Sequence, residues 1–216
     1  MVKPVLQRFF VPLPADRVGQ RLTRCVAGLA LFGLGISMFL TSELGVPAWD
    51  VFHQGVSRKT GIQIGLVIQI SSAFVLLLWI PLRQRLGLGT LLNAVQIGLV
   101  VFLLNERLPH SDLIVWRLAY IAGAMFAMGI GSGFYIGAGI GSGPRDGLML
   151  GLAQRGISIR VARTLIELTV LAAGLVLGGS IGVGTVVFTF GIGPLVQFFI
   201  PRLRLRGDET KLATAH

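Results

Sequence analysis

The stretch GSGPRDGLMLGLAQR, at residues 141–155, has a counterpart in GVPAWDVFHQGVSR, at residues 45–58, and this pair decides the organisation of the chain. A shift of 96 residues takes Asp50 onto Asp146. Each stretch is typical of a short helix opened by a proline, since the first helical position makes no use of the missing backbone N–H. At about 1.5 Å per residue, such a helix reaches about half way across a bilayer. We therefore expect two re-entrant or interfacial helices.

The correspondence continues on both sides of the two stretches. It keeps its order throughout, and dropping one residue near Thr60 changes the shift from 96 to 95. The matched pairs are Arg21 with Arg117, Gly33 with Gly129, Gly45 with Gly141, Gly61 with Gly156, Gly89-Thr90 with Gly184-Thr185, and Gly98 with Gly193. We interpret residues 21–110 and 111–201 as two sequence-similar repeats, between a cytoplasmic N-terminal segment (1–20) and a basic cytoplasmic tail (202–216).

The composition is typical of a membrane protein. Hydrophobic residues make up 53% of the chain and charged residues 13%, with a mean hydropathy of +0.79, whereas a soluble domain carries roughly twice that share of charges. The net charge of +10 comes from basic residues at the ends of apolar runs. This pattern indicates cytoplasmic loops and contact with anionic lipid head groups, and it argues against nucleic acid. Cys25 is the only cysteine and the three histidines are scattered, so we expect no disulfide, metal or cofactor.

The apolar runs predict an all-α membrane protein with about six transmembrane helices besides the two short ones. A spanning helix needs about 20 predominantly apolar residues. Suitable runs lie between Arg24 and Glu43, from Thr60 to Leu82, from Leu86 to Asn105, from Leu118 to Pro144, near 158–178 and near 184–200.

Three spans per half is an odd number, so the second half would enter the membrane from the opposite side. That is the inverted-repeat arrangement of many secondary transporters, which bind substrate near the midplane between the repeats. If the short helices cross the bilayer, the chain has eight crossings and parallel repeats instead. Both arrangements place both termini in the cytoplasm under the positive-inside rule, and helix length favours six crossings.

Four segments resemble the YczE-like family of bacterial integral membrane proteins. They are PAWDVFHQGVS at 47–57, LGLGTLLNA at 86–94, GSGPRDGLMLGL at 141–152 and GGSIGVGTVVF at 178–188. The resemblance covers nearly the whole chain, and GPRDGLM with the downstream Arg-Thr-Leu-Ile-Glu is its most specific part. It implies a multi-pass protein of the bacterial cytoplasmic membrane. It implies no substrate, because the family is functionally uncharacterised.

Asp50 and Asp146 begin the two short helices and are candidates for binding a solute or an ion. An ionisable side chain at membrane depth is costly and by default suggests a function, here the binding of a proton, a cation or an amine. Alternatively, a carboxylate in the first helical turn satisfies free backbone N–H groups and the positive end of the helix dipole. The two interpretations are compatible.

Arg145 and Trp49 occupy equivalent positions beside these carboxylates. Arg145 could bind an anionic group with the N–H donors of the helix start, or lie at the cytoplasmic head groups and only determine topology. Trp49 could stack on a substrate, although an anchor at the interface is the favoured interpretation.

Arg163 and Glu167 are four residues apart on one helix face and can pair. The pair could serve only to stabilise its own charges, or take part in gating or coupling. Their first-half equivalents are Ile68 and Ser72, so the two halves differ chemically.

A glycine series recurs every fourth residue at Gly129, Gly133, Gly137 and Gly141. We expect it to let helix backbones approach closely, as small residues do in membranes, rather than to line a substrate path.

No enzyme motif occurs, so we expect a protein that is not an enzyme. The leading interpretation is a secondary transporter for an unidentified small solute, with export as one option. The alternative is an accessory, substrate-capturing or scaffold subunit of a membrane complex, and a lipid-modifying enzyme is the weakest possibility. The expected partners are the bilayer with its anionic head groups and a small solute.

Overall fold

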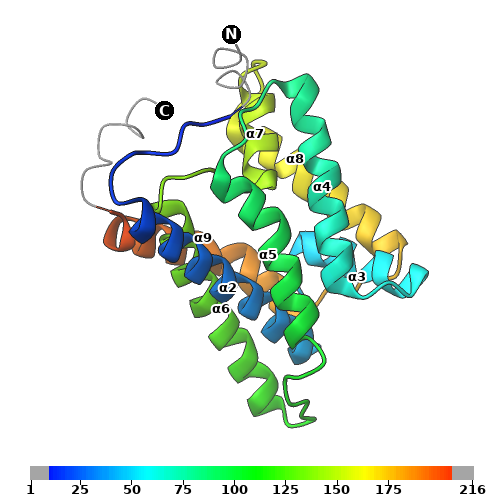
Figure 1. The fold of residues 1–216 in the computed structure, drawn as a ribbon. Coiled ribbons are helices and arrows are strands. Elements are labelled where there is room, and N and C mark those ends of the chain that lie inside the picture. Colours follow the sequence, from blue (N-terminus) through cyan, green and yellow to red (C-terminus); the bar gives the residue numbers. More distant parts are fainter. Residues whose placement is uncertain (1–9, 206–216) are drawn as a thin grey trace.

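The computed structural model describes residues 10–205, which form eight α-helices and no strand apart from one isolated bridge between Phe10 and Leu86. The helices are α2 (Val18–Ser42), α3 (Ala48–Thr60), α4 (Ile64–Leu82), α5 (Leu88–Leu104), α6 (Ile114–Gly137), α7 (Pro144–Ala153), α8 (Ile159–Val176) and α9 (Val183–Leu203). The predicted order of one long, one short and two long helices thus occurs twice (Figure 1). The outer parts of the two predicted terminal segments, 1–9 and 206–216, lie outside the described residues.

The predicted all-helical class is confirmed for the described residues. Four helices, α2, α4, α6 and α9, are long and apolar enough to cross a membrane. Helix α5 is apolar but only 17 residues long, and α8 carries Arg160, Arg163 and Glu167 in its first half. The count of six spans therefore stays a prediction.

Helices α2 and α6 form an antiparallel pair at the centre of the molecule (Figure 1). Arg21, at the start of α2, donates from Nη1 to the Ala138 carbonyl at the end of α6, at 2.8 Å. At the opposite end, Arg117 of α6 pairs with Glu43, which follows α2, at 2.9 Å. Between these ends the two backbones are in close contact. A Cβ added to Gly28 would lie 2.6 Å from the Gly131 carbonyl oxygen, which is too close for any side chain. Only glycine permits so close an approach.

Helices α5 and α9 flank this pair. Helix α5 packs on α2, and α9 packs on α6. Side chains at Gly129 and Gly133 would meet Leu195, Phe199 and Leu203 of α9. The expected role of the α6 glycine series in close packing is thereby confirmed at these two positions.

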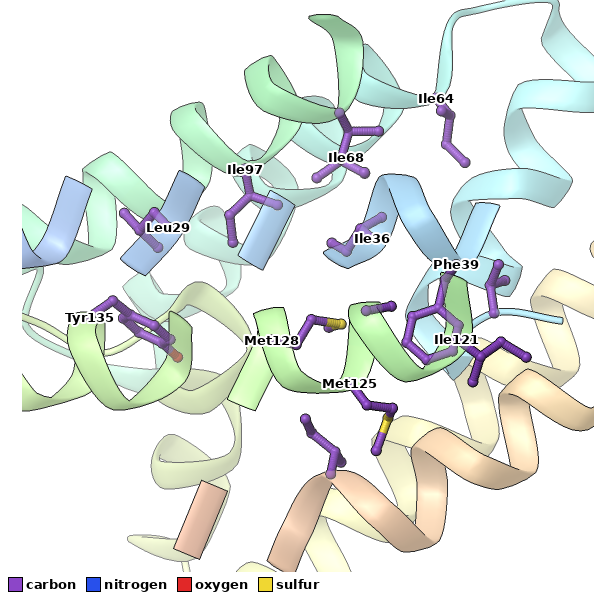
Figure 2. Close-up of a cluster of buried hydrophobic side chains, with 14 of the residues drawn as sticks. Leu29, Ile36, Phe39, Ile64, Ile68, Ile97, Ile121, Met125, Met128 and Tyr135 are labelled. Carbon is purple, nitrogen blue, oxygen red and sulfur yellow. The ribbon is translucent and has the colours of Figure 1, made fainter. Parts of the chain in front are cut away.

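Apolar side chains from both halves fill the space where α2, α4, α5 and α6 meet (Figure 2). Helix α2 supplies Leu29, Ile36 and Phe39, and α6 supplies Ile121, Met125, Met128 and Tyr135, with Ile64 and Ile68 from α4 and Ile97 from α5. Within lipid, such contacts stabilise the bundle through close packing, since exposure to lipid tails carries no hydrophobic penalty.

Each short helix packs against a long helix of the other half. Helix α3 lies on α8, and α7 lies on α4. The indole of Trp79 in α4 abuts Gly147 of α7, and its Nε1 donates to the Pro144 carbonyl at 2.9 Å. The short helices therefore tie the two halves together.

The loops before the short helices also reach across, at matched positions. Gly89 N donates to the Ile140 carbonyl at 2.9 Å, and Gly184 N donates to the Leu44 carbonyl at 2.8 Å. Under the sequence correspondence, Gly89 matches Gly184 and Leu44 matches Ile140.

Thr90 and Thr185 do not occupy the N-cap positions for which threonine is suited. Glycine is the N-cap of both α5 and α9, and each threonine is the third helical residue. Its hydroxyl accepts from the N-cap backbone, Gly87 N or Gly182 N, at 3.2 Å in both cases. Because the N-cap glycine has no side chain, the capping contact comes from the threonine that reaches back.

Candidate functional site

A cavity of about 320 Å³ lies between the two halves and is lined by residues from all eight described helices. Its wall contains every candidate residue that the sequence indicated, namely Trp49, Asp50, Arg145, Asp146, Arg163 and Glu167. Apolar side chains that include Phe32, Ile36 and Met128 complete the lining. The structure therefore brings together side chains that lie more than a hundred residues apart. Their binding of a solute or an ion stays a prediction.

The two short helices point their N-terminal turns into this cavity from opposite halves. Arg145, of the first turn of α7, stacks over the ring of Trp49, of the first turn of α3, with its guanidinium carbon 4.6 Å from the ring centroid. These residues are equivalent in the sequence correspondence. Both residues lie in the cavity wall and contact one another, and their roles stay predictions.

Asp146 is held by two donors. Its Oδ2 accepts from the Tyr135 hydroxyl at 3.1 Å and from Gly143 N at 3.3 Å. The second contact is the helix-capping interaction expected of a carboxylate in the first turn. Asp146 nevertheless lines the cavity, so capping and exposure to a solute coexist.

Asp50 has the equivalent position but different partners. Its side chain is 1% exposed, Oδ1 pairs with His53 Nδ1 at 3.0 Å, and Oδ2 has no hydrogen-bond partner. The reason is in the sequence. Gly143, which donates to Asp146, is replaced by Pro47, which has no N–H, and Tyr135 is replaced by Phe39, which has no hydroxyl.

His53 and Ser71 extend this interaction into a chain. His53 is fully buried, its Nε2 lies 2.8 Å from Ser71 Oγ, and that hydroxyl also lies 3.0 Å from the Ile68 carbonyl. With Asp50 ionised, Nδ1–H donates to Asp50 and the Ser71 hydroxyl donates to Nε2. With Asp50 protonated, Asp50 donates to Nδ1, Nε2–H donates to Ser71, and Ser71 donates to Ile68. One proton on Asp50 thus reverses the Asp50–His53 and His53–Ser71 hydrogen bonds and turns the Ser71 hydroxyl from His53 to Ile68, without moving a heavy atom.

The contact of His53 with Asp50 was not expected, because the three histidines are scattered along the sequence. The spacing of three residues between Asp50 and His53 on one helix was the available signal, because residues three apart share a helix face. The order Asp–His–Ser is also that of hydrolase triads. Here Ser71 lies outside the cavity lining and its hydroxyl contacts a backbone carbonyl, so the geometry does not present it to a substrate.

Arg163 and Glu167 form the predicted ion pair, with Nε 2.9 Å from Oε1. Their side chains are 56% and 40% exposed, although both line the cavity. They therefore lie at its mouth. Their first-half equivalents, Ile68 and Ser72, line the same cavity, so this part of the wall is charged on one side and nearly apolar on the other.

The charges in the cavity are of both signs. Asp50, Asp146 and Glu167 supply carboxylates, Arg145 and Arg163 supply guanidinium groups, and the starts of α3 and α7 add the partial positive charge of helix N-termini. No cluster of metal-ligating side chains occurs within residues 10–205. The arrangement is suited to binding a small polar or charged solute by hydrogen bonds and charge.

Residues 19–201 match a family model described as "Family of unknown function (DUF6198)". An "Uncharacterized protein" of Haemophilus influenzae is 39% identical over 173 residues, which cover 80% of this chain and 79% of the relative. "Uncharacterized membrane protein YczE" of Bacillus subtilis is 31% identical over 192 residues, covering 84% and 86%. "Uncharacterized protein YyaS" of Bacillus subtilis is 28% identical over 182 residues, covering 81% and 89%. No solved structure matches the chain.

These matches confirm the resemblance that the sequence segments indicated. Together, the relative named as a membrane protein and the four long apolar helices support a membrane-embedded, multi-pass protein.

Proposed function

Since the chain belongs to the family of unknown function DUF6198, we propose from its geometry that it is a secondary transporter for a small solute. The observation that carries this proposal is the cavity between the two halves, into which both short helices direct a carboxylate. Substrate sites of many secondary transporters lie in this position, at the interface of two repeats and beside the N-termini of short helices. The proposal includes export as one direction of transport, and no enzymatic step is part of it.

The two halves are, in this proposal, inverted repeats with six spans, α5 and α8 completing the four longer ones. The antiparallel contact between the equivalent helices α2 and α6 supports inversion, because parallel repeats would cross the bilayer in the same direction. The matched loop contacts at Gly89 and Gly184 also support it. Both termini would then face the cytoplasm of a bacterial cell, with basic residues near the anionic head groups.

Asp50 is the proposed coupling residue. Its orphan oxygen and its chain to His53 and Ser71 give it two protonation states that the surrounding structure can accept. A carboxylate that gains and loses a proton during a transport cycle needs such a surrounding, because an uncompensated buried charge is costly.

Sidedness labelling tests the inverted arrangement. Single cysteines at Lys59 and Gln154, both exposed residues at the ends of the short helices, are probed in intact cells with a membrane-impermeant thiol reagent. Cys25 can remain, because it is fully buried. Labelling of one position only is expected. Labelling or protection of both positions contradicts inverted repeats.

A flux assay tests transport itself. Proteoliposomes with an internal pH dye are exposed in turn to small zwitterionic, anionic, cationic and neutral solutes. We expect one class to move protons with the wild-type protein and not with Asp50→Asn. Asp112→Asn, at a fully exposed carboxylate outside the cavity, should behave as wild type. If no class produces flux with the wild-type protein, the transport proposal fails.

A further inference from the structure

The two halves differ in how their last two helices meet. Helices α4 and α5 pack along one another, and a Cβ on Gly65 would lie 2.5 Å from the Gly98 carbonyl oxygen. Gln69 adds a hydrogen bond from its Nε2 to the Val95 carbonyl at 2.8 Å. No comparable packing joins α8 to α9. Gly193, the counterpart of Gly98, would present a Cβ to open space.

The gap between α8 and α9 leads into the cavity. Thr189 and Gly193 of α9 line the cavity and are exposed, as are Arg163 and Glu167 on α8 at the mouth. Their counterparts on α5, Ala94 and Gly98, are buried. The cavity is therefore closed on the side of the first half and open on the side of the second.

The outer faces of the two helices beside this opening are apolar. Leu165 and Leu168 on α8 are more than half exposed, and so are Val186 and Phe190 on α9. In a membrane-embedded protein, exposed apolar helix faces contact lipid tails. The opening is therefore flanked by apolar helix faces of the kind that contact lipid tails, with the pair Arg163–Glu167 at its mouth.

Deeper in the cavity, one oxygen of Asp50 and the guanidinium of Arg145 make no hydrogen bond to the described residues. Asp50 Oδ2 is buried without a hydrogen bond. Arg145 stacks on Trp49 and is attracted electrostatically by the carboxylates of Asp50 and Asp146. It makes no hydrogen bond to any residue in the range 10–205. Polar groups without hydrogen bonds favour a ligand that supplies their missing partners.

We propose that the cavity binds the zwitterionic head group of an amphiphile, which enters from the bilayer between α8 and α9. The ammonium of the head group pairs with Asp50, and its phosphate or carboxylate pairs with Arg145 and the helix starts. A purely anionic ligand would be repelled by the three carboxylates in the cavity wall, and a purely cationic ligand would be repelled by Arg145. A volume of about 320 Å³ accommodates a head group but not a whole lipid, so the acyl chain extends through the opening.

This inference rests on the proposed function in one respect, since the bound amphiphile would be the transported solute. Binding alone can be measured without transport, by native mass spectrometry of the full chain in detergent. The probe is oleoyl lysophosphatidylethanolamine. Three comparison compounds lack one feature each: glycerophosphoethanolamine lacks the acyl chain, oleoyl lysophosphatidic acid lacks the ammonium, and oleylamine lacks the anion.

We expect the complete probe to bind at least about tenfold more tightly than each comparison compound, about 1.4 kcal/mol. Equal binding of glycerophosphoethanolamine would mean that a soluble zwitterion suffices and would overturn the membrane entry. Equal binding of either singly charged amphiphile would overturn the zwitterionic site.

The opening is tested with Thr189→Phe, which places a bulky side chain at the mouth. Thr169→Phe is the matched control, because both threonines are exposed and donate to the carbonyl four residues earlier, but only Thr189 lines the cavity. We expect Thr189→Phe to weaken probe binding about tenfold and Thr169→Phe to leave it unchanged. Unchanged binding in both variants would overturn the proposed entry route. The route would also be overturned if the protein were a dimer that Thr189→Phe dissociates, because a second copy of the chain would then cover the opening.

The two proposals can fail separately. If the probe binds but no flux assay detects movement, the head-group site stands and transport is excluded. If a water-soluble solute is transported while the probe does not bind, transport stands and the amphiphile is excluded.

Discussion

Replacement of Gly28 by alanine tests whether the close backbone contact at this residue holds α2 against α6. The added Cβ would lie 2.6 Å from both the Gly131 carbonyl oxygen and Tyr135 N. Ordinary contacts of a Cβ begin near 3.4 Å, so the helices must separate by about 0.8 Å. Both opposing atoms belong to the backbone and cannot turn aside. Overpacking of this kind costs about 1–3 kcal/mol.

Gly123→Ala is the matched control. Gly123 lies on α6 at the same interface, but its Cβ would meet only the terminal atoms of Met38, and a methionine end moves easily. Both substitutions gain about 0.8–1.0 kcal/mol of helix propensity. The difference between the two variants therefore isolates the cost of pushing the backbones apart.

The assay is thermal unfolding of the purified proteins in one detergent. Unfolding is measured as the loss of the monodisperse size-exclusion peak after heating. A chain of this size changes its midpoint by about 2–4 °C per kcal/mol, so Gly28→Ala should unfold about 2–12 °C below Gly123→Ala. Gly131→Ala should resemble Gly28→Ala, because its Cβ would lie 2.6 Å from the Gly28 carbonyl oxygen. Equal midpoints for Gly28→Ala and Gly123→Ala would refute the close approach of the two helices.

Two further changes have clear expected outcomes. Trp79→Phe removes the hydrogen bond from Nε1 to the Pro144 carbonyl and should lower the free energy of unfolding by about 1–2 kcal/mol, measured in the same thermal assay. The Arg21 guanidinium lowers the pKa of Asp16 below its usual 3.8. The stabilisation from this pair is therefore fully present above pH 3.8 and is lost as the pH falls through the lowered value in the folded state. Acid unfolding of Asp16→Asn should lack that step, and an identical acid transition in both proteins would show that the pair contributes nothing.

The sequence alone was sufficient for the helical class, the order of the helices and the identity of six cavity residues. These follow from local chemistry. Apolar runs of a given length, prolines at helix starts and glycines in loops constrain the backbone wherever the segment lies in the fold. The correspondence between Asp50 and Asp146 was enough to expect the two carboxylates in equivalent places.

The sequence alone could not show how differently these two carboxylates are held. Tyr135 and Gly143 satisfy Asp146, while Phe39 and Pro47 at the matched positions cannot satisfy Asp50. Recognising this requires knowing that position 135 faces the start of α7. The role of His53 depends in the same way on Ser71, which another helix brings to its far nitrogen.

Only the tertiary structure decided which helices touch. Each short helix packs on a long helix of the opposite half, and α4 packs on α5 while α8 stands apart from α9. Hydropathy does not predict which helices pack together, because in lipid an apolar helix face can contact a neighbouring helix or acyl chains equally well. Packing between backbones decides instead, and it depends on whether two small residues meet, as Gly65 and Gly98 do. The residues matched to that pair in the second half are Arg160 and Gly193.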